Sequence, residues 1–396
     1  MSKSDPHMGA TPGAASSPRR NGRPMDIGGG PEGYLEKGLA AVSQPFKGIT
    51  TDGNVMPGLF PIKRTGVSTQ SIRAAAENFL GSLKVEQRAK ALFPIDTVEW
   101  RKWSNIHRTI MRHGMPFFEM SDAQLDRAYA LLKESLSPQG FVTARDIIRL
   151  NETVGEMTGR FSEYGDDLYW LSIMGTPSAD EPWGWQIDGH HLIINFFVLG
   201  DQVVMTPSFL GSEPVHAEEG KYAGTRVFKT EEERGLAMIR ALSGDQRSKA
   251  VIAQKLPRDV FTTAFRDNFE LRYEGIRYDE LSNPQHDLLL RVIEIHVGRL
   301  RPDHAQIKIE EVKRHLGETH FAWMGGVEED SVFYYRVHSP VLIIEFDHQA
   351  GQAFRQYKEP YKDHIHIVVR TPNGNDYGKD LLRQHYEQSR HHSEGG

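Results

Sequence analysis

The residues best suited to chemistry lie in a histidine-bearing segment near the C-terminus. Residues 363–370 read Asp-His-Ile-His-Ile-Val-Val-Arg. This alternation predicts a β-strand in which every second residue shares a face. His364, His366 and Arg370 are therefore expected on one face, with the three aliphatic residues between them toward a core. Two imidazoles about 7 Å apart along a strand can chelate one metal ion.

Two carboxylates in the preceding predicted strand could complete such a site. Glu345 and Asp347 alternate with apolar residues and therefore share a face. If the two strands are antiparallel neighbours, these carboxylates meet His364 and His366. Nitrogen and oxygen ligands of this kind suit zinc, manganese or Fe(II). We expect His364, His366 and Glu345 to bind a divalent metal, and Asp347 or Glu345 to act as general base.

Arg370 is expected to orient an anionic substrate, because a guanidinium can bind a carboxylate or phosphate with two hydrogen bonds. A structural alternative exists for the whole group. Glu345 and Asp347 could form buried ion pairs with Arg370 or Arg336, with no catalytic role.

A second cluster lies in residues 183–195, which read Trp-Gly-Trp-Gln-Ile-Asp-Gly-His-His-Leu-Ile-Ile-Asn. We predict one long strand over 185–199, in which His190 and His191 point to opposite faces. His190 is a candidate catalytic residue, and either histidine could reach the metal. His191, Asn195 and Trp185 are candidate substrate-binding residues. A buried, hydrogen-bonded core histidine is an equal alternative for each.

Composition narrows the class of protein. The 396 residues include 18 histidines and no cysteine, and the net charge is −6. Disulfides, thiolate metal sites and a cysteine nucleophile are excluded. The acidic balance argues against nucleic acid as a partner. Motifs of serine hydrolases, zincins, P-loop enzymes and Rossmann dehydrogenases are absent. The histidines His296 and His304 are expected at the surface.

The elements that would position these residues form an α+β fold. We predict a disordered leader and irregular wrapping segment over 1–68, then helices and an antiparallel β-meander over 69–226. A second set of helices, a second meander and a C-terminal helix over about 378–388 fill 227–390, and 391–396 form a loose tail. Residues 206–211 are expected to be a loop. Residues 83–91 and 242–250 share Leu, Gln, Arg, Lys and Ala at matching positions, which favours an internal duplication.

These motifs together resemble a known family. The segments 183–192, 206–211, 321–323 and 363–385 occur in an order similar to the domain-of-unknown-function family 3500, and the resemblance covers about residues 69–386. Both pairs of histidines, the two carboxylates and Arg370 match the family pattern. The resemblance supplies no activity. Many similar proteins carry secretion signals, whereas here no apolar segment follows Arg19–Arg20, so we expect a cytoplasmic protein.

The favoured hypothesis is a metal-dependent hydrolase or lyase that acts on a small anionic organic molecule, with no membrane partner. Three alternatives remain open. An Fe(II) oxygenase would use two histidines and a carboxylate. A metal-free enzyme would use the same groups for acid–base chemistry. A binding module would recognise a ligand without turnover.

Overall fold

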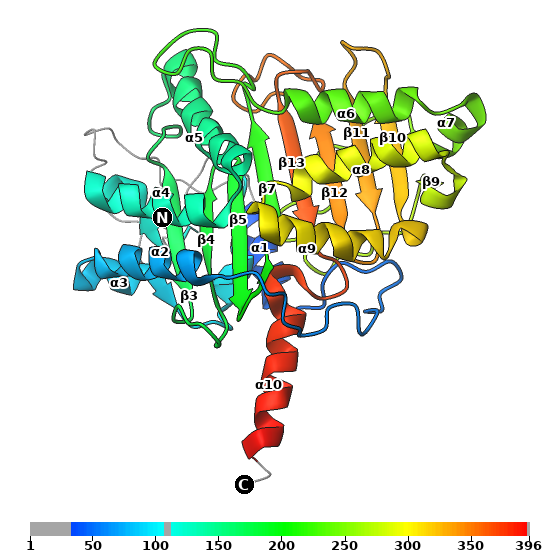
Figure 1. Ribbon diagram of the computed structural model, residues 1–396. Coiled ribbons are helices and arrows are strands. Elements are labelled where there is room, and N and C mark those ends of the chain that lie inside the picture. Colours follow the sequence, from blue (N-terminus) through cyan, green and yellow to red (C-terminus); the bar gives the residue numbers. More distant parts are fainter. Residues whose placement is uncertain (1–32, 107–111, 394–396) are drawn as a thin grey trace, which may run out of the picture.

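The computed structural model describes residues 33–106 and 112–393, which form a mixed 13-stranded sheet flanked by helices (Figure 1). The main path of the sheet runs in the order β1 (Leu92–Phe93), β3 (Tyr169–Met174), β4 (Trp183–Gly189), β5 (Leu192–Leu199), β7 (Ser208–Ser212), β13 (Ile365–Arg370), β12 (Ile343–His348), β11 (Phe333–His338), β10 (His320–Gly325) and β8 (Val251–Ala253). Short strands β2 (Met115–Pro116), β6 (Gln202–Val204) and β9 (Ile276–Arg277) pair with β3, β5 and β10. The α+β prediction is confirmed.

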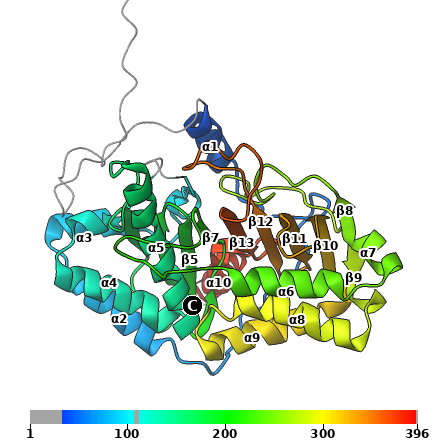
Figure 2. The ribbon, with the colours of Figure 1, turned by 90° about the horizontal axis from the view of Figure 1, so that it is seen from above.

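The two faces of the sheet are covered differently (Figure 2). Helices lie over one face, namely α2 (Gln70–Gly81), α4 (Asp122–Ser135), α5 (Pro138–Thr158), α6 (Lys229–Arg240), α8 (Asn283–Val297) and α9 (Pro302–Lys313), with α3 (Val85–Ala91) and α7 (Gly244–Ala250) beside them. The short helix α1 (Tyr34–Ser43) lies beyond the opposite face. The C-terminal α10 (Lys379–Ser393) projects from the body (Figure 1).

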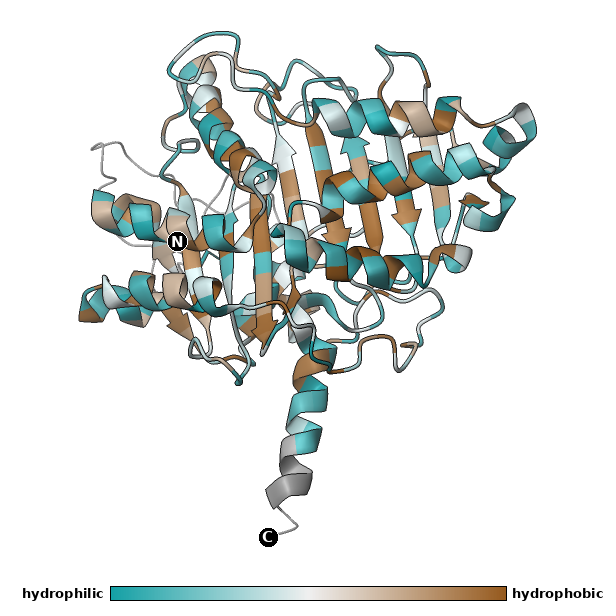
Figure 3. Ribbon diagram, viewed as in Figure 1, coloured by the Kyte–Doolittle hydropathy of each residue, from teal (hydrophilic) through white to brown (hydrophobic). Residues whose placement is uncertain are grey.

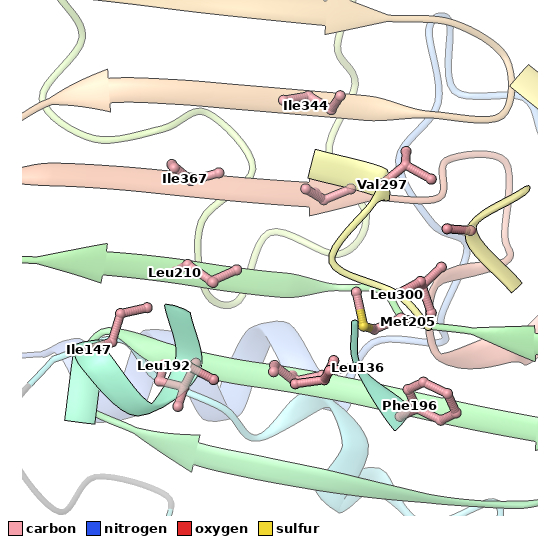
Figure 4. Close-up of a cluster of buried hydrophobic side chains, with 14 of the residues drawn as sticks. Leu136, Ile147, Leu192, Phe196, Met205, Leu210, Val297, Leu300, Ile344 and Ile367 are labelled. Atoms are coloured by element: carbon pink, nitrogen blue, oxygen red, sulfur yellow. The ribbon is translucent and has the colours of Figure 1, made fainter. Parts of the chain in front are cut away.

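The main hydrophobic core lies between the sheet and the helices (Figures 3 and 4). Ile367 of β13, Ile344 of β12 and Leu210 of β7 point into it, together with Ile147 of α5. The opposite face carries a second apolar cluster, which includes Phe209. Because the central strands are buried on both faces, any polar side chain on them must find a partner inside the protein.

The two halves of the chain contain the same kinds of element in the same order. The first half contains, in order, α3, β1, β2, α4, α5, β3, β4, β5 and β7. The second half contains the same kinds of element in the same order, namely α7, β8, β9, α8, α9, β10, β11, β12 and β13. The short β6 of the first half has no counterpart in this order. β1 runs parallel to β3, and β8 runs parallel to β10. The halves meet at the antiparallel pair β7–β13, in the middle of the sheet.

Matching hydrogen bonds accompany this matching order. The Nε2 atom of Gln87 donates to the carbonyl of Glu119 at 3.1 Å, and that of Gln246 donates to the carbonyl of Glu280 at 2.9 Å. Each of these glutamines also pairs with a glutamine in the first turn of α4 or α8. The two short segments that align in sequence therefore make equivalent tertiary contacts.

Several expectations about elements are wrong. Residues 206–211 are not a loop, because β7 begins at Ser208 and is a central strand; Pro207 immediately precedes it, where a missing N–H is tolerated. Part of the wrapping segment is helical, since α1 begins at Tyr34, and residues 1–32 of the predicted leader lie outside the described part. The last helix continues to Ser393 instead of ending near 388.

The interior also contains histidines that we placed at the surface. His296 and His304 are 1% and 2% exposed. The ring of His296 bonds to the hydroxyl of Tyr335 at 2.9 Å, which satisfies part of its polarity in the core. Within the described residues, no helix combines the length and apolar character needed to cross a membrane.

Candidate metal centre

His364 directly precedes β13 and His366 is its second residue, at one end of the strand pair where the two halves of the chain meet. Strands β12 and β13 are antiparallel neighbours, and Asp347 is directly opposite His366. The intervening residues Ile365 and Ile367 belong to the helix-side core. The alternation predicted from sequence thus places both imidazoles on the face away from the helices.

His191 reaches the same point from the first half of the chain. The predicted single strand over 185–199 is wrong, because β4 ends at Gly189 and β5 begins at Leu192, with His190 and His191 as the two-residue turn. His191 has φ 61°, the left-handed conformation that such turns usually give to Gly or Asn. A non-glycine residue held there is typical of functional sites.

The three imidazoles point the same ring atom, Nε2, toward one another. The Nε2 atom of His366 lies 3.1 Å from that of His191 and 3.1 Å from that of His364, and the third separation is 3.4 Å. Within the described residues this is a group that could hold a metal ion. Four ligands arranged tetrahedrally around zinc at about 2.0–2.1 Å would place neighbouring nitrogens about 3.3–3.4 Å apart. The observed spacing is close to that value.

Two of the rings are fixed by acceptors on their other nitrogen. The Nδ1–H of His364 donates to the carbonyl of Ala350 at 2.8 Å. The Nδ1–H of His366 donates to the carboxylate of Asp259 at 2.9 Å. A carbonyl or carboxylate oxygen can only accept, so these contacts leave the Nε2 lone pairs facing the cluster.

The facing Nε2 atoms of His364 and His366 suit a bound cation better than a direct contact between the two rings. If both Nδ1 atoms carry the hydrogen, no hydrogen remains for the 3.1 Å contact between the Nε2 atoms of His364 and His366. Burial, and then the neighbouring His366, lowers the pKa of His364 to about 4, which favours its neutral form. All three histidines are at most 5% exposed. A metal ion at the centre would satisfy the facing lone pairs.

Gly211 on β7 makes room for two of these rings. It is paired with His366 across the strands, and its N–H donates to the carbonyl of His191 at 2.8 Å. A Cβ atom at this position would lie 3.0 Å from Cδ2 of both imidazoles. The glycine therefore lets the two rings approach the backbone of the central strand.

Asp347 on β12 is the predicted carboxylate that lies opposite His366. It is fully buried on the same face as His366, and its Oδ2 accepts a hydrogen bond from Gln349. Its Oδ1 has no hydrogen-bond partner among the described residues. Burial, with the charges of Asp259 and Glu345, raises the pKa of Asp347 well above its usual value. This carboxyl group therefore favours its protonated form.

Glu345, which we predicted as a ligand and possible general base, lies outside the cluster. Its carboxylate accepts the N–H groups of Phe261 and Thr262 at 2.7 and 2.9 Å and the hydroxyl of Tyr334 at 2.8 Å. The hydroxyl of Thr262 bonds to it as well. Four donors surround this carboxylate, which therefore holds the segment that contains Phe261 and Thr262 against the sheet.

Arg370 is also committed to structural contacts, which corrects its assignment as the residue that binds a substrate anion. It is fully buried, and Nη1 forms ion pairs with Asp267 at 2.9 Å and Asp376 at 3.1 Å. Nε and Nη2 donate to the carbonyl of Thr262. Arg370 therefore forms buried ion pairs, as in the structural alternative, but its partners are Asp267 and Asp376 and not Glu345 or Asp347.

The remaining predicted residues surround the cluster or lie away from it. The ring of His190 stacks on His191 with centroids 3.9 Å apart, and its Nδ1 bonds to Asn151 at 2.7 Å. Asn195 bonds to Gln186 and the carbonyl of Pro207 within the sheet. The ring of Trp185 stacks on Phe196 in the helix-side core. His190 therefore supports His191, whereas the structure does not bring Asn195 or Trp185 to the histidines.

Sequence reasoning missed the acceptors that orient the ligands. Asp259 and Ala350 lie in irregular segments without periodic patterns, so nothing in the local sequence pointed to them. The signal for His191 was present, because a histidine pair after Gly189 can form a hairpin turn. The strongly apolar residues on both sides suggested one continuous strand instead.

The fold and the site define a class: an α+β protein with a mixed sheet and a three-histidine candidate metal centre where its two halves meet. The comparison with protein families is consistent with the resemblance stated above. The model of the family described as a protein of unknown function, DUF3500, matches residues 65–379, and the chain belongs to this family. No match was found among the curated proteins or among the solved structures.

Proposed function

We propose that this protein is a metal-dependent enzyme, a hydrolase or lyase, whose divalent metal is held by His191, His364 and His366. The observation that carries the proposal is the convergence of three buried Nε2 atoms at 3.1–3.4 Å. Zinc fits best, because three neutral imidazoles with a fourth position for water are a typical catalytic zinc site. Manganese and iron are the other candidates from the sequence.

When bound, the metal would lower the pKa of a coordinated water toward neutrality and so supply a nucleophile or base. The protein contributes the orientation of the ligands, since Asp259 and Ala350 fix two of the rings. Asp347 is the group that we expect to move a proton. It lies opposite His366 and keeps one oxygen without a protein partner in the described part of the chain.

A small anionic substrate, the class expected from the sequence, would be attracted by the metal ion itself. Arg370 does not serve here, because two aspartates neutralise it. The Fe(II) oxygenase alternative loses support, because its usual ligand set contains a carboxylate. The candidate ligands found in residues 33–106 and 112–393 are three histidines.

Elemental analysis of protein prepared without a histidine tag tests the proposal. We expect about one equivalent of metal per chain, or its restoration by added Zn²⁺, and loss of binding in His364→Ala and His366→Ala. A screen of hydrolase and lyase substrates should then be run on metal-loaded and chelator-treated protein.

His304→Gln is the matched control, because this histidine is equally buried but lies outside the cluster. It should bind metal like the wild type. Metal that cannot be restored, or unchanged binding in both cluster variants, would overturn the proposal. Turnover that resists chelators would instead favour the metal-free acid–base enzyme, and binding without turnover the ligand-binding module.

We also infer that the two halves derive from duplication of one unit. The matching element order and the matching glutamine contacts of Gln87 and Gln246 support this. Profiles built separately from the two halves of many family members should align across α3–β7 and α7–β13. The cytoplasmic location expected from the sequence stays a prediction, which fractionation of the native host cell would test.

A further inference from the structure

Two buried glutamates hold the two loops that orient the candidate metal ligands. Glu213 directly follows β7 and is 1% exposed. Its carboxylate accepts the N–H groups of Gln352, Ala353 and Phe354 at 3.0, 2.7 and 3.3 Å, and the hydroxyl of Tyr361 at 2.7 Å. A carboxylate that collects several backbone N–H groups fixes the conformation of the loop that supplies them.

The loop that Glu213 holds carries the acceptor for His364. Ala350 lies two residues before Gln352, and its carbonyl receives the Nδ1–H of His364. Gly351, between them, packs so closely that an added Cβ would lie 2.2 Å from the carbonyl oxygen of Phe354. The loop is therefore tight, and a shift at the glutamate would move the carbonyl that faces the histidine.

Glu345 does the same for His366. It accepts the N–H groups of Phe261 and Thr262, while Arg370 donates to the carbonyls of Thr262 and Thr263. This turn is thus held by a buried anion at its N–H groups and by a buried cation at its carbonyls. The same turn begins at Asp259, whose carboxylate receives the Nδ1–H of His366.

We propose that Glu213 and Glu345 are positioning residues that set the tautomers of His364 and His366. Glu345 acts through the loop it holds, and Glu213 acts through its loop and through its own carboxylate, whose Oε2 lies 3.7 Å from Nδ1 of His364. Each loop presents an acceptor to Nδ1, which keeps the hydrogen there and leaves Nε2 free to bind a cation. The tautomers follow from this geometry alone, whereas the effect on metal affinity rests on the proposed function. Partners that orient metal-binding histidines typically change metal affinity by 10–100-fold when they are mutated.

The test combines ring-nitrogen NMR of the metal-free protein with zinc titration against a chelating dye. Signals are assigned by their loss in His364→Gln and His366→Gln. In the wild type we expect both rings to carry the hydrogen on Nδ1. Glu213→Gln places an amide N–H₂ among N–H donors, so His364 should show a mixture of tautomers while His366 is unchanged. Its zinc dissociation constant should rise about 10-fold or more.

Glu345→Gln should give the reciprocal result, with His366 altered and His364 unchanged. Because Glu345 is fully buried and this variant could fail to fold, Thr262→Val supplies a milder test that removes one hydroxyl donor to the same carboxylate. Glu231→Gln is the control. Glu231 is a buried carboxylate paired with Arg299 at 2.6 Å on the helix side of the sheet, and its loss should alter neither ring.

The inference is overturned if Glu213→Gln leaves the tautomer of His364 unchanged, or if all variants, including Glu231→Gln, shift both rings equally. A different failure would concern the proposed function alone. If the tautomers respond as expected but no variant, nor the wild type, binds zinc or another divalent metal, the positioning role stands and the metal-dependent enzyme does not.

Discussion

The two ends of the central strand pair β7–β13 differ in how their polar groups are satisfied. At one end the hydroxyl of Thr206 bonds to that of Thr371 at 2.7 Å, and the N–H of Thr371 donates to Asp376 at 2.7 Å. The N–H of Tyr377 closes this end with a bond to the carbonyl of Thr206 at 2.7 Å. Polar groups here are paired with one another inside the protein.

At the other end, the Nε2 atoms of His364 and His366 face one another at 3.1 Å, and the Nδ1 contacts of both rings leave no hydrogen between them. Three Nε2 atoms lie within 3.4 Å, and Asp347 keeps an oxygen without a partner among the described residues. Burying polar groups this way costs free energy unless something binds there. We therefore interpret the first end as structural and the second as the end that serves function, and four predictions test this contrast.

The largest effect is expected from Arg370→Met at the structural end. Removing the guanidinium leaves the buried carboxylate of Asp376 without its cation and leaves Asp267 with Arg101 alone, so the free energy of unfolding should fall by about 3–5 kcal/mol. Urea denaturation measures this. The control, Arg383→Met, removes an exposed arginine paired with Asp380 and Glu387 and should cost less than about 1 kcal/mol. Equal losses in the two variants would contradict the contrast.

Zinc should stabilise the wild-type protein through the histidine end. At about 100 times its dissociation constant, a ligand that binds only the folded state adds about 2.7 kcal/mol. Thermal unfolding with zinc and with chelator should therefore show a clear upward shift, absent in His366→Ala. Zinc stabilisation that persists in this variant would place the binding site elsewhere.

Gly211→Ala should weaken zinc binding with a smaller effect on stability. Its Cβ would lie 2.9 Å from the carbonyl oxygen of Ile365 and 3.0 Å from Cδ2 of both His191 and His366, so the backbone of β13 or one ring must move. We expect the dissociation constant to rise about 10-fold, equivalent to about 1.4 kcal/mol. Gly81→Ala, which adds a methyl where no atom lies within 4 Å, should leave it unchanged. Unaltered zinc affinity in Gly211→Ala would show that the added methyl group does not displace the rings of His191 and His366.

The smallest effect on stability is expected from His191→Gly. Glycine relieves the left-handed strain at φ 61°, which offsets part of the packing lost with the ring. The unfolding free energy of the chelator-treated protein should change by about 1 kcal/mol or less, although zinc binding is lost. Urea denaturation and zinc titration of the same preparation test this. A loss as large as that of Arg370→Met would mean that His191 serves the fold.

Local patterns predicted much of the fold. Alternation around His364 and His366 gave the correct strand and the correct core face. The prediction of β7 as a loop failed because Pro207 and Gly211 are typical of loops. In this protein the proline precedes the strand and the glycine accommodates imidazoles.

The candidate site could be predicted only in part. His366 lies in β13 and His364 directly precedes it, so the two-residue spacing identifies both. The hydrogen bonds of Glu345 could not be predicted from the sequence, because its partners Phe261 and Thr262 lie 84 and 83 residues away in a segment without periodic pattern. Likewise, Arg370 looks the same in sequence whether it binds a substrate or two buried aspartates.

The wide separation of the cluster along the chain has a consequence for biosynthesis. His191 and His364 are 173 residues apart, and β13, which directly follows His364, is the last strand of the sheet to be synthesised. Domains generally fold as units as the chain emerges from the ribosome. The three histidines cannot meet until β13 has been synthesised and has paired with β7, so loading of the proposed metal would have to follow the pairing of the last strand.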